Sequence, residues 1–351
     1  MSGGVDSSTA ACLLKEQGFD CHGAIMQLFD SPASCAESEK NCGSPTDAED
    51  AKKVAQRLEI PFHVLDFSGD FEKQVITRFV EAYQSGLTPN PCVICNRFLK
   101  FESFLRCGQE LGLDRMATGH YVRVEYDSVS KRYLLYKSVD PEKDQSYVLY
   151  ALTQQQLAKT IFPLGQYRKQ EIREIAQENG LLNASKKESQ DICFVPDGDY
   201  AAFIERQTGE IPPPGDFVDC DGRVLGRHRG LIRYTVGQRK GLGIARATPY
   251  YVCSLEPASN TVVLGDEDDL YSQSLEAVHV NLIAMERIDK PIRIAAKVRY
   301  RQKEEPATLE QTGDDRVRVT FDKPQKAVTP GQAVVFYSGD IVLGGAVIVK
   351  N

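Results

Sequence analysis

The chain has 351 residues, of which 42% are hydrophobic and 26% charged, and its formal net charge is −7 at pH 7. This length and composition are typical of a soluble globular protein with two or three domains, and the negative charge argues against nucleic-acid binding over the whole surface. We expect a cytoplasmic protein with no membrane partner, because no apolar run approaches a membrane span and no signal peptide precedes the first helix. Basic residues are concentrated in residues 223–246 and 287–303, which could form local patches.

The chain begins with a glycine-rich loop, Ser2-Gly3-Gly4-Val5-Asp6-Ser7-Ser8, and a helix is expected over residues 9–17. Adjacent glycines let backbone N–H groups turn towards an anion, and the helix dipole favours a phosphate at the same point. The Gly-Lys-Ser/Thr ending of the Walker pattern is absent from the sequence. The loop therefore predicts a site for the pyrophosphate of ATP in adenylate chemistry, and the alternative is an ordinary glycine turn that caps a helix.

This loop resembles the PP-loop of the N-type ATP pyrophosphatases. Such a loop is expected to follow a buried strand at the centre of a parallel sheet, whereas this sequence starts at Met1. We interpret Met1 as an internal methionine with the true start upstream; the alternative is a sheet that lacks one strand.

The next residues predict alternating strands and helices. Strands are expected at residues 21–29 and 62–67, and a strand end at 116–121. A loop is expected over residues 30–45, and helices from Asp47, over 71–83 and over 97–111, with a second loop at 90–96. This order predicts an α/β domain with a doubly wound parallel sheet, which binds ligands at its strand ends.

The pattern changes further along the chain. Strands at residues 121–126 and 133–137 and a helix over 168–179 complete the first domain, and no long helix pattern follows residue 207. Strands at residues 297–300, 307–310, 316–321, 333–337 and 341–349 predict a small antiparallel barrel or sandwich. We place a catalytic domain at 1–196, a central β-rich domain at 197–272 and a C-terminal β-barrel at 273–351.

Ten cysteines without a secretory signal indicate buried, catalytic or metal-binding thiols rather than a disulfide framework. Cys92 and Cys95 form a Cys-x-x-Cys pair, but no second pair has matching spacing, so we expect no structural zinc and assign no metal ligands. Cys95 is expected just before a helix, where the dipole lowers the pKa of a thiol and makes it a candidate nucleophile. Cys193 lies in a second polar loop. Each could instead be a small buried side chain, and we assign Cys12 and Cys253 to the core.

Several motifs together are similar to those of the tRNA-specific 2-thiouridylase family, in the same order along nearly the whole chain. Besides the PP-loop they are Asn90-Pro91-Cys92-x-x-Cys95-Asn96, Ala117-Thr118-Gly119-His120-Tyr121, Lys143-Asp144-Gln145-Ser146-Tyr147, Ser189-Gln190-Asp191-Ile192-Cys193-Phe194, Tyr234-Thr235-Val236-Gly237-Gln238-Arg239-Lys240-Gly241 and Pro330-Gly331-Gln332. The resemblance implies a PP-loop domain of the adenine nucleotide alpha hydrolase type, followed by the central domain and the barrel.

The resemblance also implies the activity, that of a tRNA-uridine 2-sulfurtransferase. Such an enzyme uses ATP with Mg²⁺ to adenylate O2 of the wobble uridine at position 34 in the tRNAs for lysine, glutamate and glutamine. A cysteine persulfide then delivers sulfur that an upstream relay protein or a cysteine desulfurase supplies. Cys95 matches the family's nucleophile and Cys193 its persulfide carrier, with a disulfide between them as product or intermediate.

Further site residues carry over from the same resemblance. The ATP contacts are Ser2, Gly3, Gly4, Val5, Asp6, Ser7, Met26 and Gly119. The residues near the flipped base are Asn90, Pro91 and Cys92. The tRNA contacts are His120, Lys143, Asp144, Gln145, Arg299, Tyr300 and Gln332. For His120 the alternative is a satisfied histidine at a strand end.

One position departs from the family pattern. Many relatives have aspartate where this chain has Cys92, so a general-base role of that carboxylate does not transfer. Cys92, Cys95 and Cys193 could hold an iron–sulfur cluster, but we favour the persulfide route, which needs no extra ligands. Two other functions stay open: a PP-loop adenylate-forming amide synthetase that acts on a small molecule, and a non-catalytic RNA-binding or sulfur-carrier protein.

Overall fold

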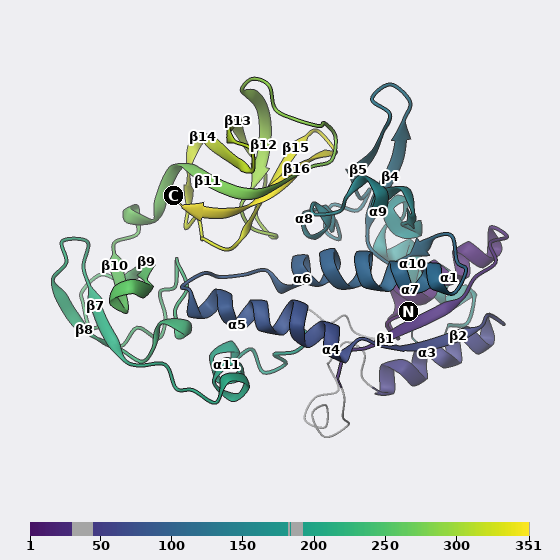
Figure 1. Ribbon diagram of the computed structural model, residues 1–351, viewed down its shortest axis with the longest axis horizontal. Helices are drawn as coiled ribbons and strands as arrows, with labels where there is room; N and C mark the ends of the chain where they lie inside the picture. Colours follow the sequence, from purple (N-terminus) through teal and green to yellow (C-terminus); the bar gives the residue numbers. More distant parts are fainter. Residues whose placement is uncertain (30–44, 182, 184–191, 351) are drawn as a thin grey trace. The chain divides into compact units, whose positions relative to one another are not determined.

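The computed structural model describes residues 1–29, 45–181, 183 and 192–350. The chain divides into two compact units, of which the first contains Met1–Val75, Cys92–Gly198 and Asp340–Val342, and the second Ile76–Pro91, Asp199–Gly339 and Leu343–Asn351. Figure 1 shows their elements. None of the helices in the described ranges combines the length and the apolar character that crossing a membrane requires.

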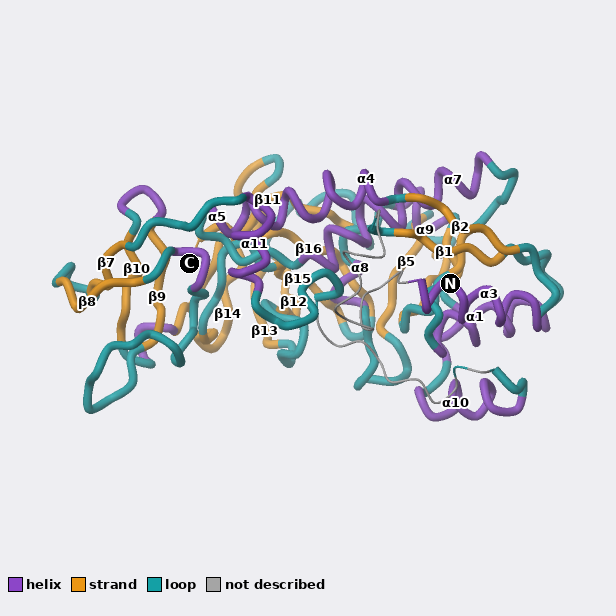
Figure 2. Tube along the Cα trace, turned by 90° about the horizontal axis from the view of Figure 1, so that it is seen from below, coloured by secondary structure: helices purple, strands orange, loops and turns teal. Residues whose placement is uncertain are grey.

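The first unit is built on short parallel strands between helices. β1 (Gly23–Gln27) pairs in parallel with β2 (Phe62–Asp66). In Figure 2 this pair runs between α3 (Pro45–Arg57) on one side and α7 (Leu105–Glu110) on the other. A second parallel pair joins β3 (Met116–Ala117) to β6 (Thr160–Ile161). Parallel strands with helices on both faces confirm the α/β class, although the described strands form two separate pairs rather than one continuous sheet.

The first unit also contains an antiparallel hairpin and several further helices. The β4–β5 hairpin is antiparallel, and β5 also pairs with Ile341 and Val342. The bounds are α1 Val5–Glu16, α4 Ser68–Phe71, a π-helical segment Glu72–Ile76, α6 Pro91–Ile94, a π-helical segment Cys95–Phe104 (η2), β4 Val122–Asp127, β5 Arg132–Lys137, α8 Ser146–Leu149, α9 Gln154–Ala158, the 3₁₀ turn Pro163–Gln166 (η3) and α10 Lys169–Glu178.

The expected loop over residues 90–96 is largely wrong, because the chain turns helical at Pro91 and stays helical to Glu110. Proline suits a first helical position, where its fixed φ matches the helix and its missing N–H is not needed. The loop predicted over residues 30–45 lies almost wholly outside the described residues, as do Ser189, Gln190 and Asp191 of the Cys193 motif.

The second unit begins with α5 (Thr77–Gln84), which packs against residues much further along the chain. Tyr83 of α5 stacks on Tyr200 of α11 (Tyr200–Thr208), with ring centroids 4.7 Å apart. A four-stranded sheet with the order β8-β7-β10-β9 follows α11, and its core includes Phe217, Val252 and Val262. The bounds are β7 Gly215–Val218, β8 Val224–His228, the 3₁₀ turn Leu231–Arg233 (η4), β9 Tyr251–Glu256, the 3₁₀ turn Pro257–Ser259 (η5), β10 Thr261–Gly265 and the 3₁₀ turn Asp268–Leu270 (η6).

The C-terminal strands confirm the predicted antiparallel barrel. They follow the order β11-β14-β13-β12-β15-β16, and β16 pairs back onto β11, which closes the barrel. Their bounds are β11 Tyr271–Leu282, β12 Ile292–Lys297, β13 Glu305–Gly313, β14 Arg316–Lys326, β15 Ala333–Ser338 and β16 Ile341–Lys350. The strand expected at residues 297–300 is wrong, since β12 ends at Lys297, and the long strand β11 was not predicted because serine, glutamine and glutamate interrupt its apolar positions.

Candidate active site

The glycine-rich loop leads directly into α1, with Gly4 as its N-cap residue. Glycine has no side chain with which to satisfy the N–H groups of the first turn, so that turn is suited to an external anion. Gly3 has φ of +68°, and a Cβ atom there would lie 2.6 Å from the backbone oxygen of Asp47. Both the backbone conformation and the close approach of α3 therefore require glycine at position 3.

Side chains of the loop hold its shape. The hydroxyls of Ser7 and Ser8 donate to the carbonyl of Gly4 at 3.2 and 3.0 Å, and the Ser2 N–H donates to Ser7 Oγ at 3.0 Å. Asn183, which is only 5% exposed, donates from Nδ2 to the Gly3 carbonyl and to Ser8 Oγ. Its Oδ1 is buried and has no hydrogen-bond partner among the described residues. No sequence pattern marks Asn183, which lies far along the chain from the loop that it supports.

The carboxylate of Asp6 has a buried cationic partner. Lys169 Nζ lies 2.7 and 2.8 Å from the two carboxylate oxygens, and the Tyr121 hydroxyl donates to Oδ1 at 2.7 Å. The side chain of Lys169 is 8% exposed and that of Asp6 is 29% exposed. Sequence reasoning missed Lys169, because nothing in the helix that it begins distinguishes it from the other lysines.

Replacing Lys169 by Met is expected to destabilise the protein by about 2 kcal/mol, because it leaves a partly buried carboxylate without this cation. Urea unfolding measures the difference. Lys53→Met is the matched control, since its partner Glu49 is exposed and that pair is worth less than about 0.5 kcal/mol. Equal effects of the two substitutions would mean that the Asp6–Lys169 pair contributes no more than a surface pair.

Gly119 follows β3 and packs against the start of α1. A Cβ atom at this position would lie 2.8 Å from the carbonyl carbon of Asp6 and 2.8 Å from the backbone N of Ser7. The structure thus brings Gly119 onto the glycine-rich loop, to which Ser2, Gly3, Gly4, Val5, Asp6 and Ser7 belong. The glycine cradle and the uncapped helix start fit the pyrophosphate of ATP. Met26, the other predicted ATP contact, lies on β1 opposite Leu65.

The predicted tRNA residues of the first unit mostly make contacts within the fold. Asp144 accepts hydrogen bonds from the Ser138 N–H and the Ser146 hydroxyl at 3.1 and 2.7 Å. Gln145 exchanges hydrogen bonds with the backbone of Tyr121, whose hydroxyl contacts Asp6. Asp144 therefore shapes the loop, and Gln145 connects it through Tyr121 to Asp6 at the start of α1. Lys143 is half-buried in the same loop.

His120 is buried between aromatic rings. Its ring centroid lies 5.8 Å from that of Phe101 and 6.3 Å from that of Phe162, and its Nδ1 hydrogen-bonds to Thr118 Oγ1 at 2.7 Å. Burial lowers the pKa of His120 well below 6.5, and the charge of Lys100 lowers it further. These contacts favour the alternative, in which His120 is a structural histidine at a strand end whose hydrogen bond is made within the fold. The tRNA role of His120 stays a prediction.

The wild-type protein is expected to lose stability below pH 6.5 more steeply than His120→Gln. The folded state holds the ring neutral, whereas the unfolded chain binds a proton there as the pH falls, so the unfolded state gains stability in acid. Each pH unit below about 6.5 then costs up to about 1.4 kcal/mol, and nothing is lost above that pH. Urea unfolding between pH 8 and 5 measures both slopes, and parallel slopes would show that the folded protein protonates His120.

Cys92 and Cys95 lie on the helix that begins at Pro91. Cys92 is exposed in its first turn, and Cys95 is half-buried at the point where α6 passes into the π-helical segment η2. The expectation that Cys95 precedes a helix is wrong, so the argument from a helix N-terminus does not apply to it. π-Helical turns are frequent at functional sites, and this junction fixes Cys95 at such a turn.

The residue next to Cys95 is a buried amide. Asn96 is 3% exposed and donates from Nδ2 to the Val148 carbonyl at 3.1 Å, which ties η2 to α8. Its Oδ1 has no hydrogen-bond partner within the described part of the chain. The Asn96 contact explains why the motif ends in asparagine: this side chain positions the helix that carries Cys95.

Cys193 lies in a turn that Phe194 anchors. The Val195 N–H donates to the Ile192 carbonyl at 2.9 Å, and the Phe194 ring packs edge-on against Phe71 of α4 at 5.7 Å. α4 in turn contacts η2, the segment that Cys95 begins. The turn that carries Cys193 and the helix that carries Cys95 therefore share α4 as a packing partner. Cys193 itself is half-buried.

The predicted residues of the second unit lie around the loops of the barrel. Arg299 donates from Nη2 to the Ala327 carbonyl at 2.8 Å and to Thr329 Oγ1 at 3.1 Å, and the neighbouring Tyr300 is 38% exposed. Gln332 donates from Nε2 to the carbonyls of Thr88 and Pro89 at 2.7 and 3.3 Å. Gln332 thus holds the segment that immediately precedes Asn90 and Pro91.

Family comparisons cover nearly the whole chain. Residues 1–197 match the tRNA methyl transferase HUP domain, residues 201–266 the tRNA methyl transferase PRC-barrel domain, and residues 272–348 the aminomethyltransferase beta-barrel domain. The HUP match agrees with a nucleotide site at the glycine-rich loop. A structure of NMN synthetase from Francisella tularensis aligns with 60% of this chain and 75% of its own at 16% identity, but its TM-score of 0.33 is too low to support an argument.

Named relatives match over the full length. The chain is 52% identical over 349 residues to "tRNA-specific 2-thiouridylase MnmA" of Acetivibrio thermocellus, which covers 99% of this chain and 97% of that protein. It is 47% identical over 351 residues to the protein of the same name in Clostridioides difficile, which covers 100% of this chain and 97% of that protein. Similarity of this extent over all three domains establishes that the chain belongs to the tRNA-specific 2-thiouridylase family.

Proposed function

We propose that this protein thiolates the wobble uridine at position 34 of the tRNAs for lysine, glutamate and glutamine, with Cys193 as persulfide carrier and Cys95 as nucleophile. As a member of the family it is a tRNA-uridine 2-sulfurtransferase that uses ATP. The observation that carries the finer proposal is the glycine-rich loop at the start of α1, with Gly119 packed on it, in a chain that matches 2-thiouridylases over its full length.

In the proposed nucleotide site, the backbone of residues 2–7 binds the pyrophosphate portion of ATP with Mg²⁺. Gly119 leaves room for the loop, and Asn183 and Lys169 hold its shape through Gly3, Ser8 and Asp6. Transfer of AMP to O2 of the uracil releases pyrophosphate and converts a poor leaving oxygen into a good one. Met26 is the remaining ATP contact that we propose.

The proposed sulfur chemistry uses both thiols. The terminal sulfur of a persulfide on Cys193 attacks C2 of the adenylated base, and AMP leaves with the C2–O electron pair. The Cys95 thiolate then attacks Cys193 Sγ and breaks the S–S bond, which leaves sulfur on C2 and forms a Cys95–Cys193 disulfide. A thiol reductant restores the two thiols. An upstream relay protein or a cysteine desulfurase supplies the next persulfide.

The residues proposed to contact tRNA are taken unit by unit. Asn90, Pro91 and Cys92 contact the flipped base, and Gln332 supports them through Thr88 and Pro89. The proposed set is completed by His120, Lys143, Asp144, Gln145, Arg299 and Tyr300.

The cytoplasmic location and the domain boundaries at residues 196 and 272 also stay predictions. Because the relatives match over the full length, neither a small-molecule amide synthetase nor a non-catalytic RNA binder has an observation that favours it.

Nucleoside mass spectrometry tests this proposal directly. Unmodified tRNAs for lysine, glutamate and glutamine are incubated with the protein, ATP, Mg²⁺ and a polysulfide, which supplies sulfur at the oxidation level of a persulfide, and a matched tRNA with cytidine at position 34 is the control. A 2-thiouridine peak that requires ATP and uridine 34 supports the proposal. Thiolation at another position, or of the control tRNA, would contradict the assigned target while leaving the family activity intact.

A further inference from the structure

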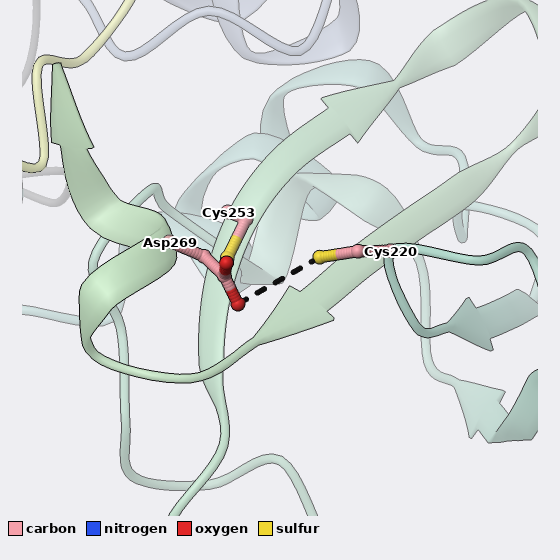
Figure 3. Close-up of side chains that lie close together, drawn as sticks. All are labelled: Cys220, Cys253 and Asp269. Atoms are coloured by element: carbon pink, nitrogen blue, oxygen red, sulfur yellow. Dashed lines mark hydrogen bonds between the residues drawn. The ribbon is translucent and has the colours of Figure 1, made fainter.

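A second group of thiols lies around the four-stranded sheet of the second unit. The proposed catalytic cysteines, Cys95 and Cys193, belong to the first unit. Cys220 lies in the turn between β7 and β8, Cys253 on β9, and Asp269 on the 3₁₀ turn η6 that leads into β11. Figure 3 shows their side chains converging from these three segments. The sulfur atoms and a carboxylate oxygen all lie within 4.8 Å of one another. The proposed thiolation reaction uses none of these residues.

The distance between two of these atoms is close to that between ligands in a tetrahedral metal site. Cys220 Sγ lies 3.9 Å from Asp269 Oδ2. Zinc–sulfur bonds of about 2.3 Å and zinc–oxygen bonds of about 2.1 Å place sulfur and oxygen ligands about 3.6 Å apart around a tetrahedral ion. A shift of a few tenths of an ångström therefore brings this pair into coordination distance of one ion, and the turn that carries Cys220 is exposed.

The backbone around the group leaves space for it and fixes the carboxylate. A Cβ atom at Gly265 would lie 2.5 Å from Asp269 Oδ2 and 2.7 Å from Cys253 Sγ, so only glycine leaves this space open. The Asp266 N–H donates to Asp269 Oδ2 at 2.8 Å and holds the carboxylate in place beside the two sulfurs. This outer hydrogen bond is of the kind that orients metal-binding carboxylates.

The local charge also favours a cation. The carboxylates of Asp269, Asp219 and Asp221 all place negative potential on Cys220. Arg246, a nearby basic side chain, is paired with Asp266, at 2.7 Å, rather than with Asp269. Two sulfur ligands exclude the hard ions Mg²⁺ and Ca²⁺, which prefer oxygen, and select a softer divalent ion.

We propose that Cys220, Cys253 and Asp269 bind one zinc ion, with water as the fourth ligand on the exposed side of Cys220. Each thiol gives its proton to solvent as it becomes a thiolate ligand. The ion ties the β7–β8 turn, β9 and η6 together at the point where the central sheet continues into β11. Its role is structural, and the inference does not depend on the proposed thiolation chemistry.

Cobalt titration of the full-length protein tests the site. The background is a variant with Cys92, Cys95 and Cys193 all changed to Ser, so that metal binding at the proposed catalytic cysteines does not contribute. The protein is reduced and stripped with a chelator, and Co²⁺ is added while thiolate-to-cobalt charge-transfer absorption is recorded. One equivalent of Co²⁺ is expected to produce the absorption and one equivalent of Zn²⁺ to displace it.

Further substitutions in this background identify the ligands. Cys220→Ser and Cys253→Ser are each expected to weaken Co²⁺ binding at least about 100-fold, and Asp269→Asn about 10- to 100-fold. Gly265→Ala is expected to close the site while it leaves all three ligands in place. Cys107→Ser, a half-buried cysteine outside the group, is the matched control and is expected to keep full binding.

Three results would overturn the proposal. The first is that the reduced background protein shows no charge-transfer absorption when Co²⁺ is added, and the second is that the absorption persists in Cys220→Ser. The third is that Cys220 and Cys253 form a disulfide, and that its reduction restores both thiols without any metal binding. Zn²⁺ is also expected to raise the unfolding temperature of the background protein but not that of Cys220→Ser. That comparison keeps the test valid if Gly265→Ala or Cys253→Ser folds poorly.

Discussion

Cys193→Ser is expected to lower the rate of 2-thiouridine formation at least about 1000-fold while ATP-dependent release of pyrophosphate continues. A serine hydroxyl cannot carry persulfide sulfur, whereas the glycine-rich loop, which we propose binds ATP, is unaffected by the change. Single-turnover reactions with tRNA, analysed for 2-thiouridine and for pyrophosphate in the same samples, measure both steps. Normal thiolation by this variant would remove Cys193 from the proposed reaction.

Cys95→Ser separates the two thiol roles. Without the thiol that resolves the adduct, sulfur transfer is expected to stop at a covalent link between tRNA and Cys193, which a reductant cleaves. Cys107→Ser is the matched control because it removes a half-buried thiol from α7, outside the proposed reaction. Accumulation of the link in Cys193→Ser instead would reverse the assignment of the two cysteines.

Gly119→Ala is expected to weaken ATP binding about 100-fold, because the added methyl group displaces the backbone at Asp6 and Ser7 by a distance of about 1 Å. The methyl group would otherwise lie 2.8 Å from two backbone atoms of the loop, and backbone cannot rotate away as a flexible side chain can. Equilibrium binding of ATP to the purified variant measures the loss.

The control for this substitution is Gly108→Ala on α7. Among the described residues, no atom outside the neighbouring helix backbone lies within 4 Å of a Cβ placed at Gly108, so the change is expected to leave ATP affinity intact and to stabilise the helix slightly. If Gly119→Ala binds ATP as tightly as Gly108→Ala, the contact between Gly119 and the loop does not shape the nucleotide site.

Sequence reasoning succeeded where a function depends on a short run of residues. The glycines at positions 3 and 4 and the helix after them form one local structure, and their pattern predicted it, although the helix begins at Val5 rather than at the expected residue 9. The alternation of strands and helices likewise predicted the α/β class, and the valine-rich strands predicted the barrel. The expected helix start at residue 97 was wrong because Pro91 was interpreted as a loop residue, although its conformation suits the first turn of a helix.

Residues that contact each other across long distances in the sequence are not marked by any short motif. Lys169 supports Asp6, and Asn183 supports Gly3, through contacts that exist only once the chain has folded. The same holds for Cys253, which was assigned to the core on its valine-rich surroundings but is half-buried beside Cys220 and Asp269. Metal motifs are recognisable when two ligands lie on one turn or helix, whereas these three lie on separate segments.

The hydrogen bonds of Gln332 to Thr88 and Pro89 affect the order of events during synthesis. Gln332 lies 244 residues after Thr88, so a ribosome that adds about 5–20 residues per second needs about 12–50 s to deliver it. During that interval the segment before Asn90 lacks these two hydrogen bonds. Likewise, Tyr83 of α5 cannot stack on Tyr200 until Tyr200 has been synthesised. The segment before Asn90 therefore gains these two hydrogen bonds only after the chain has been synthesised as far as Gln332.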